Sequence, residues 1–373
     1  MPPSPRTTVR AAAALLPDGL HGPVEVAVDG GRIDAVRPGP DPGDGSLLAP
    51  GFVDLQVNGV DDVDVAVADG ADWDRLAALL APTGVTAWLP TLVSRPLDRY
   101  GAPLARIAAA ALGAAHGAAA PVVLGAHLEG PFLGARLGAH DPRSVVPLDL
   151  QWLAALPPTV RLVTLAPEQA GADEAIRELV ARGVVVSLGH SGADVATTSA
   201  AVDAGARMVT HLFNAMAAVH QREPGIAGAA LADDRVVAGL IVDLVHVHPA
   251  LVRTAFRAKG AAGIALVTDA VAWRAGHLAA LEVRLVDGAP RLADGTLAGS
   301  ALTMDAAVRN AVHVAGVPVA DALRAASTTP AEVLGDADRG RIAAGARADL
   351  VLLDAERLAV RRTLVGGEVV WEA

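Results

Sequence analysis

The sequence predicts an α/β protein with a TIM (β/α)8 barrel and a small β-sandwich domain built from both termini. Across the middle of the chain, eight short apolar segments of strand character alternate with Ala- and Leu-rich helical segments. Their apolar residues run continuously, which indicates strands buried on both faces of a parallel sheet. Eight such units fit a closed barrel better than an open sheet. Both ends of the chain have strand character without helical periodicity.

The elements of the predicted barrel follow in chain order. The strands are 51–57, 84–89, 122–128, 161–166, 184–189, 207–211, 236–242 and 264–268. Helical segments near 72–81, 98–115, 173–182, 194–204, 249–259 and 303–315 fill most of the gaps. The segment 281–297 has the pattern of a hairpin inserted near the last strand.

The two ends of the chain each predict antiparallel strands. Residues 24–36 contain two strands around Asp29-Gly30-Gly31, a hairpin turn signal. Segments 349–354 and 363–371 repeat the pattern, with Gly366-Gly367 at the second turn. We therefore expect three parts in chain order. They are the N-terminal part of the sandwich at 1–49, the barrel at 50–332 and the C-terminal part of the sandwich at 333–373.

Composition excludes several classes of protein. Among 373 residues, 52% are apolar and 19% charged, with a mean hydropathy of +0.40, which is enough for a large core. A net charge of −11 argues against a nucleic-acid partner. The absence of cysteine excludes disulfides, iron–sulfur clusters and thiol nucleophiles. Lys259 is the only lysine, so Schiff-base catalysis and a P-loop are excluded. Any metal site must therefore use His, Asp and Glu.

No membrane-spanning segment is expected. No apolar run reaches the roughly 18 residues that cross a bilayer. The apolar run at 11–16 is shorter than that of a signal peptide and ends at Pro17-Asp18-Gly19. We expect a cytoplasmic protein without a membrane partner.

Polar residues close six of the eight predicted strands. They are Gln56, Asn58, His127, Glu129, His190, His211, Asp243 and Asp269. The active sites of TIM barrels lie at the C-terminal ends of the strands, so these side chains are expected to meet on one rim. One such residue would mean little, because turns favour Asp and Asn. Six strand ends together indicate a catalytic rim.

Three of these residues suit a metal ion. Glu129 is expected to be buried among apolar residues, where a carboxylate needs a cation or strong hydrogen-bond donors nearby. With His190 and His211 it offers the ligands that Zn²⁺ or Fe²⁺ accepts, with a position left open for water. An ordinary loop carboxylate and hydrogen-bonded rim histidines are the alternatives. His127 lies two residues before Glu129 on the same strand face. Because one metal ligand from that strand suffices, His127 is expected to be a structural or supporting residue.

Several motifs carry a resemblance to a known family. They are PGFVD at 50–54, HLEGPF at 127–132, GHS at 189–191, THLFNAM at 210–216, REPGIAG at 222–228, TDA at 268–270 and GRIAAGARADLVLLD at 340–354. In this order they resemble the N-acetylglucosamine-6-phosphate deacetylases of the amidohydrolase superfamily. The similarity runs from about residue 45 to the end. PGFVD and TDA indicate only the superfamily, and GRIAAGARADLVLLD resembles the C-terminal signature of that superfamily, whereas HLEGPF, THLFNAM and REPG together are far more specific.

The resemblance implies a set of catalytic residues and a cofactor. Glu129, His190 and His211 would bind the metal, Asp269 would transfer protons, and His140 would polarise the amide carbonyl. Many superfamily relatives have His-x-His on the first strand and a carboxylated lysine, but here Gln56-Val57-Asn58 stands there and no strand ends in lysine. One divalent metal ion per chain is therefore expected. Zinc is the first expectation, with iron, cobalt or manganese as alternatives.

The resemblance also implies the substrate. Gln56, Asn214 and Ala215 would line the sugar site, and His246 and Arg222 would contact the phosphate. In the family this arginine comes from the neighbouring subunit, so a homodimer is expected. The expected reaction converts N-acetyl-D-glucosamine 6-phosphate to D-glucosamine 6-phosphate and acetate. The alternatives are a sibling amidohydrolase acting on another N-acetylated amino-sugar phosphate or a cyclic amide, and a non-catalytic binding barrel. The acidic loop 60–64 departs from the family pattern, which often has glycines there.

Overall fold

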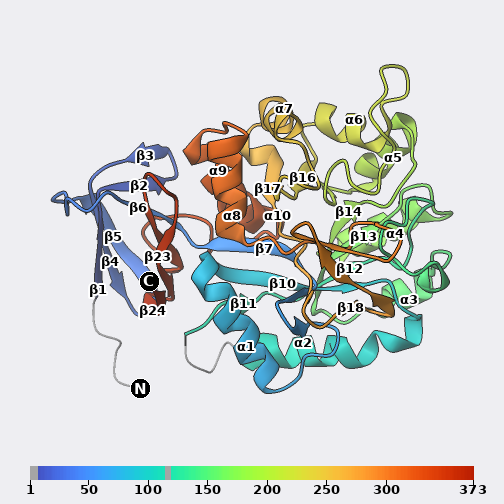
Figure 1. The fold of residues 1–373 in the computed structure, drawn as a ribbon, viewed down its shortest axis with the longest axis horizontal. Coiled ribbons are helices and arrows are strands. Elements are labelled where there is room, and N and C mark those ends of the chain that lie inside the picture. Colours follow the sequence, from blue (N-terminus) through green and yellow to red (C-terminus); the bar gives the residue numbers. More distant parts are fainter. Residues whose placement is uncertain (1–6, 114–118) are drawn as a thin grey trace.

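Eight parallel strands form a nearly closed barrel in this computed structural model, which describes residues 7–113 and 119–373 (Figure 1). In spatial order the strands are β7 (Phe52–Val57), β10 (Val85–Val93), β12 (Ala126–Glu129), β13 (Val160–Leu165), β14 (Val185–Leu188), β15 (Met208–Val209), β16 (Val237–Leu240) and β17 (Ile264–Leu266). Just beyond β17, the Asp269 N–H donates to the Gln56 carbonyl at 2.9 Å, which joins the last strand to the first. All eight predicted barrel strands are confirmed. A short strand, β11 (Val122–Val123), pairs in parallel with β10 just before β12 and begins the third barrel strand.

Helices surround the barrel. They are α1 (Ala71–Leu80), α2 (Gly101–Gly113), α3 (Leu150–Ala154), α4 (Ala172–Ala181), α5 (Val195–Ala204), α6 (Gly225–Ala232), α7 (Pro249–Lys259), α8 (Met304–Arg309), α9 (Val319–Ala326) and α10 (Thr328–Val333). Short helical turns are η1 (Ala81–Thr83), η2 (Leu97–Arg99), η3 (Pro142–Ser144), η4 (Ala261–Gly263) and the π-helical η5 (Asn310–Val314). The predicted helix at 303–315 is thus α8 continued by η5. The sequence analysis missed α6, because its residues Gly225–Ala232 are apolar without a helical period. No helix in the described ranges is both long and apolar enough to cross a membrane.

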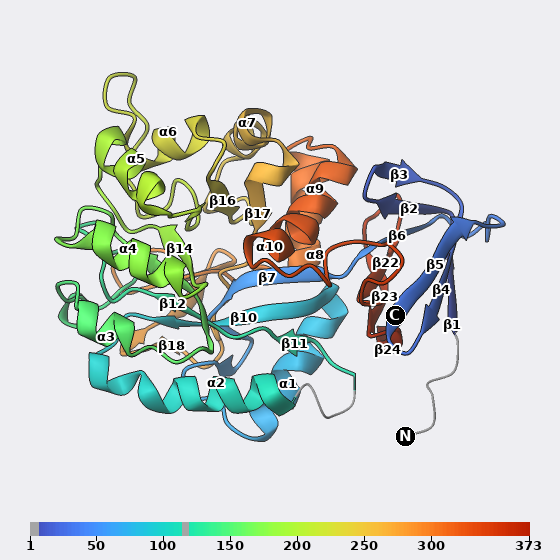
Figure 2. The same ribbon diagram turned by 180° about the vertical axis from the view of Figure 1, so that it is seen from behind.

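Both ends of the chain build the β-sandwich, which lies to one side of the barrel (Figure 2). One sheet contains β1 (Thr7–Ala11), β4 (Val24–Asp29) and β5 (Arg32–Pro38). The other has the order β24 (Glu368–Glu372), β23 (Val360–Val365), β22 (Leu350–Asp354), β6 (Ser46–Pro50), β2 (Ala13–Leu16), β3 (Gly19–His21). A separate apolar core fills the space between them, with Val26, Ile33, Leu48 and Leu350 among its buried side chains. The predicted assembly from both termini is confirmed. The boundaries at 49/50 and 332/333 stay a prediction.

Short strands between the barrel elements form three two-stranded ladders. β8 (Gly59–Val60) pairs with β9 (Val63–Asp64), and β18 (His277–Leu278) pairs with β19 (Leu281–Glu282). β20 (Arg284–Val286) pairs with β21 (Ala289–Arg291), which confirms the hairpin predicted within 281–297.

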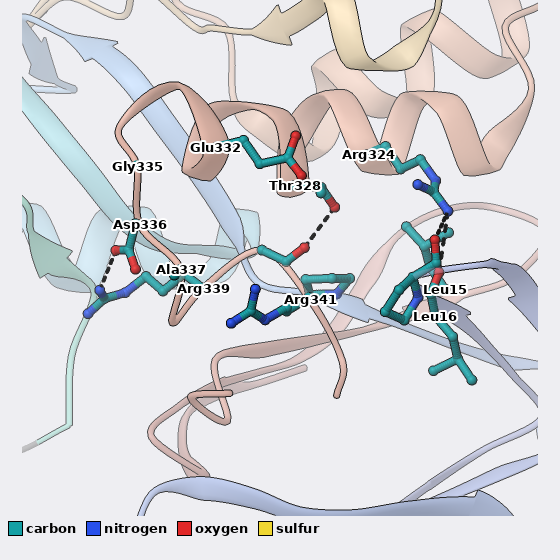
Figure 3. Close-up of a pocket in the computed structure, with 13 residues that line it drawn as sticks. Leu15, Leu16, Arg324, Thr328, Glu332, Gly335, Asp336, Ala337, Arg339 and Arg341 are labelled. Carbon is teal, nitrogen blue, oxygen red and sulfur yellow. Dashed lines mark hydrogen bonds and ion pairs between the residues drawn. The ribbon is translucent and has the colours of Figure 1, made fainter. Parts of the chain in front are cut away.

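Polar contacts attach the sandwich to the barrel. Arg324 of α9 donates from Nη2 to the Pro17 carbonyl at 2.7 Å and to the Leu16 carbonyl at 3.4 Å, just after β2. On another side of the junction, Thr363 of β23 donates to the Ala81 carbonyl at 2.8 Å. Figure 3 shows Arg324 reaching from its helix across a cavity of about 460 Å³ between the two parts. The guanidinium of Arg324 therefore bridges segments that are some three hundred residues apart in sequence.

Arg324→Ala is expected to destabilise the fold by about 0.5–1.5 kcal/mol, the usual net contribution of one hydrogen bond, because its 2.7 Å bond to the Pro17 carbonyl is exposed to solvent. Arg177→Ala is the matched control, because within the described residues this arginine of α4 makes only an exposed pair with Asp173 at 3.9 Å. Urea unfolding followed by circular dichroism measures both variants. Equal stability of the two would mean that the hydrogen bonds of Arg324 do not stabilise the junction.

Candidate active site

The predicted rim residues gather around one cavity of about 380 Å³ at the C-terminal ends of the barrel strands. Those that line it are Asn58, Glu129, His140, His190, His211, Asn214, Ala215, His246 and Asp269. Gln56 is buried beneath the cavity and bonds to two of its carboxylates. The structure thus brings together all the predicted site residues except Arg222.

Glu129 is the centre of the cluster. Its Oε1 lies 3.1 Å from His190 Nε2 and 2.9 Å from His211 Nε2, and the two imidazole nitrogens are 3.1 Å apart. Ligand atoms of Glu129, His140 and His190 also lie within 4.8 Å of one another. Burial alone would raise the pKa of Glu129, but hydrogen bonds from the two imidazoles and their charges outweigh it and hold the pKa well below its usual value. Glu129 is therefore a buried anion facing imidazole nitrogens.

The surroundings of His190 fit a metal ligand. Its Nδ1 lies 3.1 Å from the carbonyls of both Arg136 and Leu137, which can only accept, so Nδ1 carries the hydrogen. Nε2 then faces Glu129 Oε1, and in the neutral ring it would offer its lone pair to a metal ion bound between the two side chains. Metal-bound histidines usually donate their other ring N–H in this way. The Nδ1 of His211 has no such partner in the described part of the chain. A carboxylate and two imidazoles without sulfur suit zinc or another divalent transition metal.

His140 points its second ring nitrogen into the cavity. The Ser94 N–H donates to His140 Nδ1 at 3.3 Å, and the Ser94 hydroxyl lies 2.8 Å from the same nitrogen. Burial and the nearby charge of His190 lower the pKa of His140 to about 3, so the ring is neutral. A neutral ring that accepts at Nδ1 carries its hydrogen on Nε2, which lies 4.0 Å from Glu129 Oε2. His140 can therefore donate a hydrogen bond to a bound molecule.

Asp269 is held through one of its two oxygens. Gln56 Nε2 and Asn58 Nδ2 both donate to Oδ1, at 3.0 Å and 2.7 Å. Both amides come from the end of β7, which lies beside the end of β17. Burial and the negative charge of Glu129 raise the pKa of Asp269 to about 8. With Oδ1 engaged by two donors, Oδ2 is the oxygen that can accept a proton.

Three residues of this cluster have a left-handed backbone. The φ angles are 50° at His190, 31° at His211 and 50° at Asp269, each just after a barrel strand. Residues other than glycine seldom adopt this conformation, and such strain concentrates at functional sites. The turn after each strand therefore aims the side chain over the barrel mouth at a conformational cost.

His127 and Asp54 lie deeper in the barrel. The two ring nitrogens of His127 contact the hydroxyls of Thr91 and Thr164 at 3.3 Å and 2.8 Å, and burial lowers its pKa to about 4. Asp54 accepts a hydrogen bond from the Thr268 hydroxyl at 2.6 Å, and burial raises its pKa to about 7. His127 thus supports the strand beneath Glu129 and does not face the cavity.

Several other predicted residues lie outside the cluster. Arg222 is exposed on the loop before α6 and does not line the cavity in a single chain, so its predicted contact with a neighbouring subunit's site stays a prediction. Asp243 accepts from His246 Nδ1 at 2.7 Å and fixes that ring. In the acidic loop 60–64, Asp61 pairs with Arg274 at 2.9 Å and is not among the residues that line the cavity.

The sequence analysis missed Ser94 and Arg291. Ser94 holds His140, and Arg291 lines the cavity from the hairpin strand β21. The hairpin itself was visible in the sequence as a turn between two apolar strands. Its position over the cavity depends on contacts that no local pattern reveals.

Comparisons with known proteins agree with this site. Residues 47–370 match the model of the amidohydrolase family. The chain is 41% identical to N-acetylglucosamine-6-phosphate deacetylase of Bos taurus, over 88% of this chain and 84% of that protein. It is also 41% identical to N-acetylgalactosamine-6-phosphate deacetylase of Escherichia coli O157:H7, over 93% of this chain and 94% of that protein.

A solved structure extends the likeness to three dimensions. The N-acetyl-D-glucosamine-6-phosphate deacetylase of Mycobacterium smegmatis, a mutant in complex with N-acetyl-D-glucosamine-6-phosphate, matches 98% of this chain and 100% of its own, with a TM-score of 0.90 and 35% identity. The family match, the curated relatives and the shared fold all cover nearly the whole chain. This protein therefore belongs to the amidohydrolase family.

Proposed function

We propose that this chain hydrolyses N-acetyl-D-glucosamine 6-phosphate to D-glucosamine 6-phosphate and acetate, in amino-sugar catabolism. The observation that carries the proposal is the cluster of Glu129, His190 and His211 beside Asp269 in one cavity. The deacetylases named above support the choice of substrate.

Glu129, His190 and His211 would hold one divalent metal ion per chain. Zinc is the first choice from the mixed carboxylate and imidazole set, and iron, cobalt or manganese are alternatives. When bound, such an ion supplies Lewis-acid polarisation to the substrate carbonyl and to the attacking water. Gln56 donates to Glu129 Oε1 at 3.0 Å, so it would orient this carboxylate.

Asp269 and His140 would move the protons and hold the charge. A divalent cation beside Glu129 would offset the burial and the Glu129 charge that raise the pKa of Asp269, so Oδ2 would be deprotonated and accept a proton as water adds its oxygen to the amide carbon. It would return this proton to the nitrogen as the C–N bond breaks. This type of proton transfer contributes about 10²–10⁴ in rate. His140 Nε2–H donates to the carbonyl oxygen, where negative charge develops. The products are acetate and the free amine.

The sugar and its phosphate would occupy the outer part of the cavity. Asn214 and Ala215 line the cavity, and His246, whose ring Asp243 holds at Nδ1, would donate to the phosphate from Nε2 in its protonated form. Arg222 would reach the phosphate from a neighbouring subunit, which makes the enzyme a homodimer. A dianionic sugar phosphate does not cross a lipid membrane unaided, so we place the enzyme in the cytoplasm, where such substrates form.

The second candidate substrate is N-acetyl-D-galactosamine 6-phosphate. It is favoured by the relative from E. coli O157:H7 that bears this name, which the chain matches over a larger share of both sequences than it does the bovine one. The two sugars differ only in the configuration of the hydroxyl at C4.

Acetate release from both sugar phosphates tests the function. We expect N-acetyl-D-glucosamine 6-phosphate to give the higher kcat/KM, and elemental analysis after dialysis to give one metal equivalent per chain. A higher value for the galactose isomer would reassign the substrate. Full activity with two equivalents would contradict the single-metal site. Release of acetate from neither sugar phosphate would reject the function.

A further inference from the structure

We propose that Arg291 binds the phosphate of the substrate from within the same subunit and so sets the preference for phosphorylated sugars. This inference rests on the proposed function and adds a residue that the family resemblance does not supply. It places a permanent positive charge on the hairpin inserted after the last barrel strand.

The first argument is the charge of the cavity. Among the described residues that line it, Arg291 is the only lysine or arginine. Two lining carboxylates, Glu129 and Asp269, stand at the catalytic end, and the whole chain carries a net charge of −11. A dianion entering this cavity needs local positive charge. A guanidinium supplies it together with donors that match phosphate oxygens.

The second argument is that Arg291 is only partly engaged. Its Nη1 donates to the Gly295 carbonyl at 2.8 Å, within the hairpin's own turn. No carboxylate of the described chain pairs with it, whereas Arg284 on the opposite strand donates to Glu282. The carbonyl contact restrains the side chain and leaves its remaining N–H donors for a ligand. A half-buried guanidinium without a counter-ion favours an anionic partner.

The third argument is that the hairpin is fixed to the catalytic end of the barrel. Buried Val271, Leu278, Val283 and Ala298 form one cluster, and Leu292, the neighbour of Arg291 in the chain, packs against it. The Ser300 N–H donates to the Asp269 carbonyl at 2.8 Å, so the segment that follows the hairpin pairs with the segment that carries Asp269.

Gly299 makes this close approach possible. It has a φ of 63°, and a Cβ there would stand 2.4 Å from Val271 Cγ1 and 2.7 Å from the Asp269 carbonyl oxygen. Only glycine fits such an approach. The hairpin carrying Arg291 therefore has a fixed position relative to the reacting end of the substrate.

Steady-state kinetics on N-acetylglucosamine, with and without its phosphate, tests the role. Arg291→Ala should lower kcat/KM for the phosphorylated sugar by about 10- to 150-fold, the equivalent of one charge-assisted hydrogen bond. Activity on the plain sugar should stay within about two-fold, and Arg291→Lys should keep part of the preference. Arg284→Ala is the matched control, because it removes the same charge from the directly paired position, where the side chain is 76% exposed. It should change neither value.

The outcomes separate this proposal from the function on which it rests. Equal losses on the two sugars in Arg291→Ala would make Arg291 a support for the cavity wall and overturn the proposal. An unchanged preference of Arg291→Ala for the phosphorylated sugar would also overturn the proposal. If the wild-type enzyme releases acetate from no hexosamine phosphate, the proposed function itself fails. That result is obtained before any variant is compared.

Hybrid dimers show from which subunit each arginine acts. When the Arg291→Ala chain is paired with an Asp269→Asn chain, each site lacks either Arg291 or the proton acceptor, so phosphate preference should stay low. A matching hybrid of Arg222→Ala with Asp269→Asn restores one complete site if Arg222 acts across the interface. Recovery of the preference in the Arg291→Ala hybrid would contradict action within one subunit.

Discussion

Asp269→Asn is expected to lower kcat by at least about 10²-fold while metal content and substrate affinity persist. Asparagine keeps the shape, and its oxygen can still accept from Gln56 and Asn58, which hold Oδ1 of the native carboxylate. It cannot accept a proton at the Oδ2 position. Rate measurements beside elemental analysis of the same sample check both parts.

Asp61→Asn provides the comparison for this change. Asp61 is also a carboxylate of the barrel mouth, but it pairs with Arg274 outside the cavity lining, so its variant should keep near-normal kcat. Loss of metal in Asp269→Asn would assign Asp269 as a ligand and remove its role in proton transfer.

Glu129→Gln is expected to empty the metal site and abolish most activity. Glu129 is the only carboxylate in contact with both His190 and His211 in the described chain, so the change removes the anionic ligand. The loss of metal affinity should exceed the about 10–100-fold typical of a residue that only supports a ligand. Metal content after dialysis against a weak chelator measures it.

Glu168→Gln is the control for that experiment. Glu168 accepts from the Ser191 hydroxyl at 2.6 Å, one residue beyond His190, yet it does not face the Glu129 cluster. We expect this variant to retain its metal. Equal retention by both variants would show that the imidazoles alone hold the ion.

Much of the barrel and its rim was predictable from sequence, because both depend on local order. Continuous apolar runs indicate strands that are buried on both faces. Parallel strands then bring their C-terminal residues to one rim of the barrel. The sequence does not show how far into the barrel the side chains of His127 and Glu129 lie. Two residues along a strand move a side chain by roughly 7 Å. That separates a histidine satisfied by threonines from a carboxylate in the cavity.

Other parts depend on contacts between distant segments. Ser94 and His140 lie on different loops, and only the closed barrel brings them to 2.8 Å. Arg291 belongs to a hairpin whose sequence specifies its turn but not the surface on which it packs. The helices α9 and α10 were missed because both are short and Pro330 lies within the second.

The central place of β6 in its sheet has a consequence for biosynthesis. Pro50 of β6 pairs with Leu350 of β22, so the ribosome must add about three hundred residues before this partner is made. At roughly 5–20 residues per second, that takes about 15–60 s. Throughout this interval one edge of a fully buried strand has no partner, the kind of surface that recruits other chains. Chains that end before β22 should therefore aggregate more readily than full-length chains.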